Sequence, residues 1–197
     1  AADFERNTAV VAELLDEESK RFTATADQTA REQAEATLAR FDQRVADLNL
    51  PRDNAASLMA VCVFVLKDAL DGGELTPEHA PALQELMERE FARHKAPLNF
   101  DDASLTGVYV SFAMAAERLA RERTAYAAEA NEAEAKRDQP GLSDLEKSKA
   151  RLAASYANAN RSMTETGMRM MLKSLLNPLD PKSLVFNEDG TVSVKKP

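Results

Sequence analysis

The feature that most constrains the fold is an uninterrupted apolar run from Leu58 to Leu66, inside the stretch Ala55–Leu70. A helix on a protein surface alternates apolar and polar faces, whereas this stretch is apolar on every side. Val61, Val63 and Val65 alternate as in a strand, but the length and the Leu, Met and Ala residues favour a helix. The sequence therefore predicts a central helix buried on most sides, with other elements packed around it.

Residues at both ends of this run define its limits. Asp53 or Asn54 can cap its first turn, and Asp71-Gly72-Gly73 can end it because glycine readily adopts the left-handed conformation. The run is shorter than the ~18 to 20 apolar residues of a spanning helix, so we expect no membrane insertion. Cys62, the only cysteine of the chain, lies within the run, and we expect a buried, unreactive thiol there.

Composition narrows the functional classes. The 197 residues are 44% hydrophobic and 29% charged with only 6 glycines, which is typical of a helical globular protein. The net charge of −8 repels phosphate groups, so we expect no nucleic-acid partner. The chain contains no G-x-S-x-G, no phosphate-binding glycine loop and no H-E-x-x-H. We therefore expect a protein that is not an enzyme and that uses no cofactor.

Apolar periodicity predicts helices along most of the chain, as one helical domain over residues 1–197. Residues 4–48 form an N-terminal helix from Phe4 to Phe22 and a second from Ala30, with Thr23–Thr29 as a break or a weak joint. Residues 53–95 hold the core helices, the later one starting with Thr76 as cap and Pro77 as the first helical residue.

The second half of the chain predicts a long hairpin over residues 101–176. Asp101 or Asp102 caps its first helix, Gln139-Pro140-Gly141 turns the chain, and Ser143-x-x-Glu146 is a capping box. The helix that this box opens runs to about Leu176 through Leu145, Leu152, Tyr156, Met163, Gly167, Met170 and Met171. The two helices should pack antiparallel, and their outer half should project beyond the core.

Residues 177–197 form the tail. Two β-prone runs, Ser183–Phe186 and Thr191–Val194, flank a turn that contains Gly190 and predict a short β-hairpin. The predicted fold class is therefore all-α: a helical bundle with a buried central helix, a long projecting αα-hairpin and a short C-terminal β-hairpin.

Histidine and methionine provide the candidate ligands. Glu90 and His94 are four residues apart on one helical face, which suits a pair of metal ligands but leaves a third unidentified. His79 follows a helix start closely and is expected at the surface. Met163, Met168, Met170 and Met171 cluster on the last helix. Core packing is their first interpretation, a pliable partner-binding groove the second and a Cu(I) site the third.

The last helix also has an unusual number of polar residues in its interior: Ser155, Asn158, Asn160, Ser162, Thr164 and Thr166. Such residues compete with the helical backbone for hydrogen bonds. They indicate either a solvated face or a polar surface held against a partner or a second copy of the chain.

Three segments resemble an uncharacterised, all-helical bacterial family whose members are often exported. These segments are Leu50-Pro51-x-Asp53-Asn54-Ala55, Gly72-Gly73-Glu74-Leu75-Thr76 and Pro178-Leu179-Asp180-Pro181. The resemblance implies an all-α fold and brings no activity and no site residues. The start Ala1-Ala2-Asp3, without Met, is what signal-peptide cleavage leaves, so we expect an exported or periplasmic protein; a trimmed cytoplasmic chain is the alternative.

The leading functional hypothesis is a non-enzymatic interaction or structural protein that works through helical faces. Its partner would be another protein or a second copy of itself. One alternative is a small-ligand or metal-binding helical protein with a site among Glu90, His94 and the methionines. The other is an acidic inhibitor or immunity-type protein, suggested by the net charge of −8.

Overall fold

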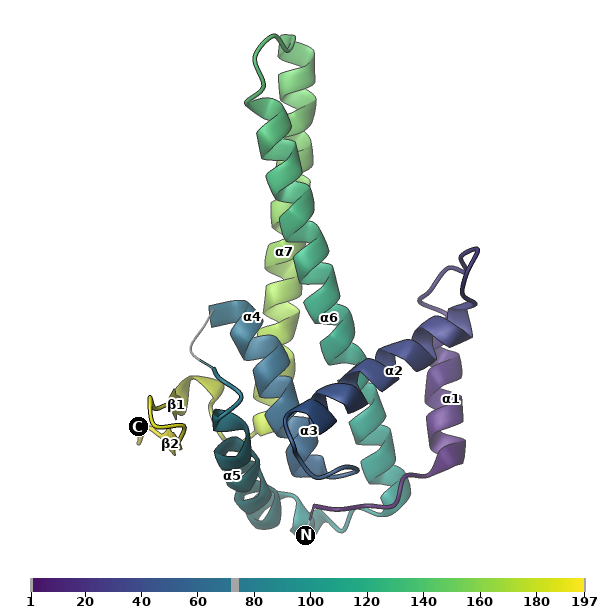
Figure 1. Ribbon diagram of the computed structural model, residues 1–197, viewed down its shortest axis with the longest axis vertical. Coiled ribbons are helices and arrows are strands. Elements are labelled where there is room, and N and C mark those ends of the chain that lie inside the picture. Colours follow the sequence, from purple (N-terminus) through teal and green to yellow (C-terminus); the bar gives the residue numbers. More distant parts are fainter. Residues whose placement is uncertain (1, 72–74, 197) are drawn as a thin grey trace.

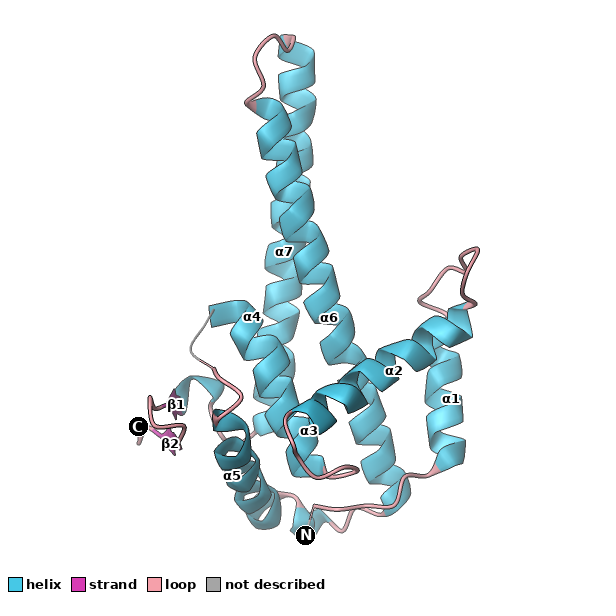
Figure 2. Ribbon diagram, in the orientation of Figure 1, coloured by secondary structure: helices cyan, strands magenta, loops and turns pink. Residues whose placement is uncertain are grey.

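The computed structural model describes residues 2–71 and 75–196, and within them the protein is a helical bundle from which two long helices project (Figure 1). The helices are α1 (Thr8–Ser19), α2 (Ala30–Asp47), α3 (Ala55–Cys62), α4 (Asp68–Asp71), α5 (His79–His94), α6 (Asp102–Arg137) and α7 (Asp144–Leu176). Strands β1 (Leu184–Phe186) and β2 (Val192–Val194) form a short antiparallel pair near the C-terminus (Figure 2). The predicted fold class is confirmed.

The apolar run forms the centre of the bundle. Every residue of α3 is buried, and the helix continues through a π-helical turn, η1 (Val63–Lys67), into α4. Asn54 is the cap, because its side-chain oxygen accepts a hydrogen bond from the Ser57 N–H at 2.9 Å. The helix reaches Asp71, and the predicted stop at Gly72-Gly73 lies outside the described residues.

Helices α2, α5, α6 and α7 all contact α3. The largest fully buried side chains come from every one of these elements: Phe41, Leu58, Leu66, Leu83, Met87, Tyr109, Met168 and Leu176. Cys62 is 0% exposed, and this burial raises the pKa of its thiol. The predicted burial of Cys62 is therefore confirmed, and a neutral thiol without solvent access is a poor nucleophile.

The first helix is shorter than predicted. Periodicity from Phe4 to Phe22 predicted a helix over that range, but α1 begins only after Asn7, whose side chain accepts from the Val10 N–H at 3.1 Å. The preceding segment is extended, and the Phe4 N–H donates to the Asp53 carbonyl at 3.0 Å. Phe4 is therefore buried as part of an extended segment and not as part of a helix. Of the break and the weak joint that Thr23–Thr29 allowed, the structure has the break, because α1 ends at Ser19 and α2 begins at Ala30 with Thr29 as its cap.

A network of polar side chains joins the N-terminal segment to α2 and α6. Asp42 accepts two hydrogen bonds from Arg6, at 2.8 and 3.0 Å, and one from the Tyr109 hydroxyl at 2.8 Å. Arg6 also donates to Asp53 at 2.8 Å, and its guanidinium lies 4.9 Å from the centre of the Tyr109 ring. Burial is the main cause that raises the pKa of Tyr109. Elsewhere, Glu117 of α6, only 2% exposed, pairs with Arg44 of α2.

His79 links α5 to the C-terminal tail. The helix predicted to begin after Thr76 begins instead at His79, after a turn. The Thr76 N–H donates to His79 Nδ1 at 3.0 Å, so the ring hydrogen is on Nε2, which donates to the Asn187 carbonyl at 2.6 Å. The Phe186 ring packs edge-on against this imidazole. His79 is 4% exposed, so the surface position predicted for it is wrong.

The long hairpin has the predicted caps. Asp101 accepts from the Ser104 N–H at 2.7 Å to begin α6, and Ser143 and Glu146 form the capping box of α7. Gly141 has a positive φ of 86° in the turn between the two helices, a conformation that favours glycine. The lower parts of α6 and α7 belong to the bundle, and the upper parts contact only each other (Figure 1).

Candidate functional site

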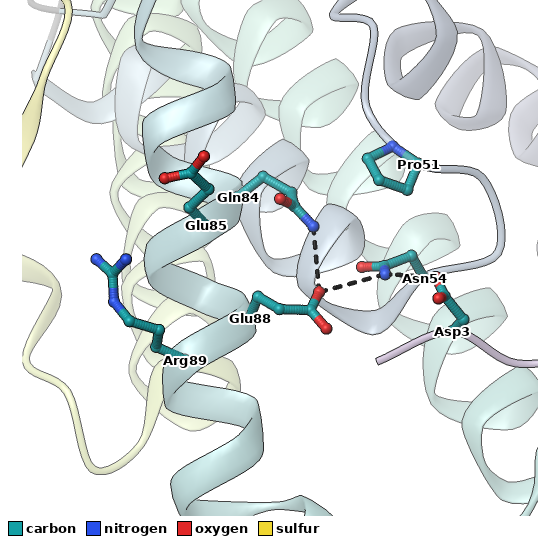
Figure 3. A pocket seen from close by; sticks show the side chains of 7 residues that line it. All are labelled: Asp3, Pro51, Asn54, Gln84, Glu85, Glu88 and Arg89. Carbon is teal, nitrogen blue, oxygen red and sulfur yellow. Dashed lines mark hydrogen bonds between the residues drawn. The ribbon is translucent and has the colours of Figure 1, made fainter. Parts of the chain in front are cut away.

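One candidate site is a shallow depression of about 480 Å³ where the N-terminal segment, the loop before α3 and α5 meet (Figure 3). Its centre is Glu88, which accepts hydrogen bonds from the Ala2 N–H at 2.9 Å, from Gln84 at 3.2 Å and from Asn54 at 3.4 Å. Asn54 also donates to Asp3 at 2.7 Å. These polar groups bind one another, so the network fastens the N-terminal segment onto α3 and α5.

The structure brings the predicted metal pair together. His94 Nε2 lies 3.3 Å from Glu90 Oε2, and Arg93 approaches the other oxygen of Glu90 at 3.5 Å. Within residues 2–71 and 75–196, no group of three or more His, Cys, Asp or Glu side chains is placed to hold a metal ion. The two predicted ligands are therefore neighbours on α5, with Arg93 beside them.

The four methionines of the predicted cluster divide between two faces of α7. Met168 and Met171 are buried, at 0% and 9% exposure, and pack in the core. Met163 and Met170 are 72% and 67% exposed. Core packing therefore describes the first pair only, and the second pair belongs to a solvent-facing surface.

The inner face of α7 consists mainly of small residues in the projecting part of the hairpin. Ala154, Ala157 and Thr164 are buried there, and α6 contributes the buried Ala130 and Ala133. Their spacing of three and seven residues is typical of a helix-pair seam. Small side chains let the two backbones approach closely, so the hairpin is held together without its large apolar residues.

Those large residues face the solvent. Leu145, Leu152, Tyr156, Met163 and Met170 are between 60% and 72% exposed. We call these five residues the α7 stripe. They recur at intervals of seven, four, seven and seven residues, which are a and d positions of heptads, and Lys149, Ala159 and Thr166 occupy the a and d positions that this series leaves open. Because a helix advances about 100° per residue, the stripe lies almost opposite the inner face.

The flanks of the stripe carry no charge along the middle of α7. The residues beside it from Leu152 to Gly167 are small or neutral: Ala153, Ser155, Asn160, Ser162 and Gly167. The outward side of α6 in the same hairpin is ordinary by comparison, with exposed Arg121, Glu129, Glu132 and Lys136. A solvated helix face in a chain with 29% charged residues would be expected to resemble α6. The outward face of α7 instead has the composition of an interface core.

A cavity of about 490 Å³ opens at the end of the stripe nearest the bundle. Met170 is part of its wall, together with Leu70, Leu179 and the cationic Arg169, Lys173 and Lys182. The apolar part of this wall continues the stripe, so the exposed apolar surface extends from the tip of the hairpin to the tail of the chain.

The sequence contains the signal for this surface but does not show which face of the helix packs on its neighbour. The predicted line through Leu145, Leu152, Tyr156, Met163, Gly167, Met170 and Met171 mixes the two faces of α7, because Met171 is buried and the five large residues before it are exposed. Two heptad patterns run along α7, and the pattern with small residues is the one that packs on α6. Of the six polar residues predicted to mark a solvated or partner-binding face, Ser155, Asn160 and Ser162 lie beside the stripe, whereas Thr164 is buried.

No protein-family model, curated protein or solved structure matches this chain. None of the helices in the described part of the chain combines the length and apolar character needed to cross a bilayer.

Proposed function

We propose that this protein is a non-enzymatic interaction protein that binds a protein partner along the α7 stripe. The observation that carries the proposal is the exposure of five large apolar side chains at heptad spacing on a helix face that carries no charge from Leu152 to Gly167. Large contiguous apolar patches on a protein surface commonly mark interaction sites. Between Leu145 and Met170 the stripe extends over about 38 Å at 1.5 Å per residue.

The geometry suits a helical partner. Heptad positions on one helix receive the side chains of a second helix that crosses at about 20°. Of the four methionines, Met163 and Met170 would contact the partner, and thioether side chains adapt well to such surfaces. The inhibitor alternative depends on the net charge of −8, whereas the five side chains of the stripe are all uncharged.

A photo-crosslinker placed in the stripe tests this function. The photoreactive residue p-benzoylphenylalanine replaces Tyr156 in one variant and, as a matched control, the exposed Glu129 of α6 in the other. Each variant is irradiated in the cells that make the protein, and adducts are identified by mass spectrometry. We expect one discrete adduct from position 156 and none from position 129. Equal labelling at both positions, or no adduct at position 156, would contradict the proposal.

A further inference from the structure

We infer that the α7 stripe binds the α7 stripe of a second copy of this chain, with the two helices antiparallel. This inference rests on the proposed function and identifies its partner. The twofold axis passes between Tyr156 and Ala159, near the midpoint of the stripe.

The order of residues along the stripe is complementary to its own reverse. When one α7 is turned end for end on the other, Leu145 lies opposite Met170, Leu152 opposite Met163, and Tyr156 opposite Ala159. In an antiparallel pair each a position meets a d position, and every one of these pairs obeys that rule. The bulky Tyr156 ring, 66% exposed in one copy, meets the small Ala159 of the other. Twofold symmetry makes each pair occur twice.

The flanking residues allow the two helices to approach closely. Ser155 of one copy faces Ser162 of the other, and Ala153 faces Asn160. None of these side chains is large or charged, so none holds the backbones apart or is left as an unpaired charge at the contact.

Charge selects the antiparallel arrangement over the parallel one. Lys149 occupies an a position and lies opposite Thr166 in the antiparallel pair. A parallel, in-register pair would place Lys149 against Lys149 and Tyr156 against Tyr156. The antiparallel pair also brings Glu146, in the first turn of one α7, near Lys173 in the last turns of the other.

The cavity beside Met170 lies where the hairpin tip of the second copy ends. In the register above, Leu142 of the turn falls beside Lys173, which lines that cavity of about 490 Å³. Leu142 is the apolar residue of the turn, and Leu70 and Leu179 provide an apolar wall to receive it. The same contact forms at both ends of the dimer.

The small area of the stripe indicates a weak, reversible dimer. A face about 38 Å long and about 10 Å wide covers about 400 Å² on each copy. This area is half of the roughly 800 Å² per partner of a standard stable interface. We therefore expect a dimer that dissociates at micromolar concentration, so the protein must be measured over about 1 to 300 μM.

Light scattering after size exclusion gives the first test. The wild-type mass should rise from 21.6 kDa toward twice that value as the loading concentration increases. Leu152→Glu with Met163→Glu should hold the mass at 21.6 kDa, without loss of helical circular dichroism, because both side chains are at least 60% exposed. Ala128→Glu, on the outward side of α6, adds the same kind of charge outside the stripe and should leave dimerisation unchanged.

Engineered cysteines test the direction of the helices. Leu145→Cys and Met170→Cys are made as separate proteins of different tag length, and Cys62 stays silent because it is buried. When the two are mixed and oxidised, the antiparallel dimer gives the mixed disulfide. Each protein oxidised alone should remain uncrosslinked, because the like residues of an antiparallel pair are about 38 Å apart.

The results separate this inference from the proposed function. Self-linking of each single variant would indicate a parallel dimer and overturn the antiparallel arrangement. A chain that stays monomeric at all concentrations would overturn self-association altogether. A crosslink from position 156 to a different protein would then leave the proposed function standing, whereas the absence of any adduct would remove both.

Discussion

Asp42→Ala tests how much the Arg6–Asp42–Tyr109 network contributes to stability. The substitution leaves the Tyr109 hydroxyl, in a residue that is 1% exposed, without its acceptor at 2.8 Å. A buried hydroxyl without a partner costs about 1 to 3 kcal/mol. Arg6 loses two hydrogen bonds but keeps Asp53, and its side chain is 24% exposed, so this loss adds about 1 kcal/mol. We expect the free energy of unfolding to fall by about 3 kcal/mol.

Cys62 provides the assay. Its thiol is fully buried, so a maleimide reagent can modify it only when the core opens. When reclosing is faster than modification, the rate is proportional to the population of the open state. Since 1.4 kcal/mol corresponds to a factor of ten, Asp42→Ala should speed the modification of Cys62 about a hundredfold.

Two controls make this test specific. Asp47→Ala removes an exposed aspartate of the same helix and should change the rate by less than about threefold. Tyr109→Phe added to Asp42→Ala removes the hydroxyl that has lost its acceptor, and should recover about 1 kcal/mol of the loss. A rate for Asp42→Ala within threefold of wild type, or strictly additive effects of the two substitutions, would refute the reasoning.

Three further predictions concern single side chains. Ser57→Ala should raise the free energy of unfolding by about 1 kcal/mol in urea titrations, because the buried Ser57 hydroxyl has no hydrogen-bond partner within the described residues. In the unfolded chain Tyr109 ionises above its ordinary pKa of 10.0, whereas burial keeps the folded phenol protonated. Stability should therefore fall by about 1 kcal/mol between pH 10 and 11, and Tyr109→Phe should abolish this part of the fall. His79→Ala should release the β-hairpin, and limited digestion with chymotrypsin should then cleave after Phe186 faster than in the wild type.

Each of these predictions has a contradicting result. Ser104→Ala is the matched control for Ser57→Ala, because each serine lies three residues after a helix cap and Ser104 is exposed. A loss of stability in Ser57→Ala would show that the Ser57 hydroxyl has a hydrogen-bond partner. Equal alkaline slopes for Tyr109→Phe and wild type would exclude Tyr109 as the titrating group. Unchanged cleavage after Phe186 would mean that other contacts hold the tail.

The elements of this fold could be predicted because their signals are local. Asn54, Asp101 and Ser143 each cap the helix that begins one residue later, and such caps act within one turn. The apolar run Leu58–Leu66 predicted a buried helix because no side of that helix is polar. The same reasoning failed at Phe4, which is buried by an extended segment paired with Asp53, far along the chain.

The contacts between elements could not be predicted in the same way. Arg6 and Asp42, Arg44 and Glu117, or His79 and Asn187 are between 36 and 108 residues apart. A charged or imidazole side chain in a helical pattern looks the same whether it faces solvent or a distant partner. The α7 stripe is an intermediate case, since its heptads are visible in the sequence but the face that packs on α6 depends on the small residues of both helices.

The π-helical turn between α3 and α4 makes the central helix tolerant of a change in chain length at one place. A π turn accommodates one residue more than the α-helical path requires. Deletion of Phe64 or Val65, the two partly exposed apolar residues of η1, would convert it to a regular α turn and leave the buried faces of α3 and α4 where they are. The same deletion inside α3 would rotate every following residue by about 100° and bring buried side chains to the surface.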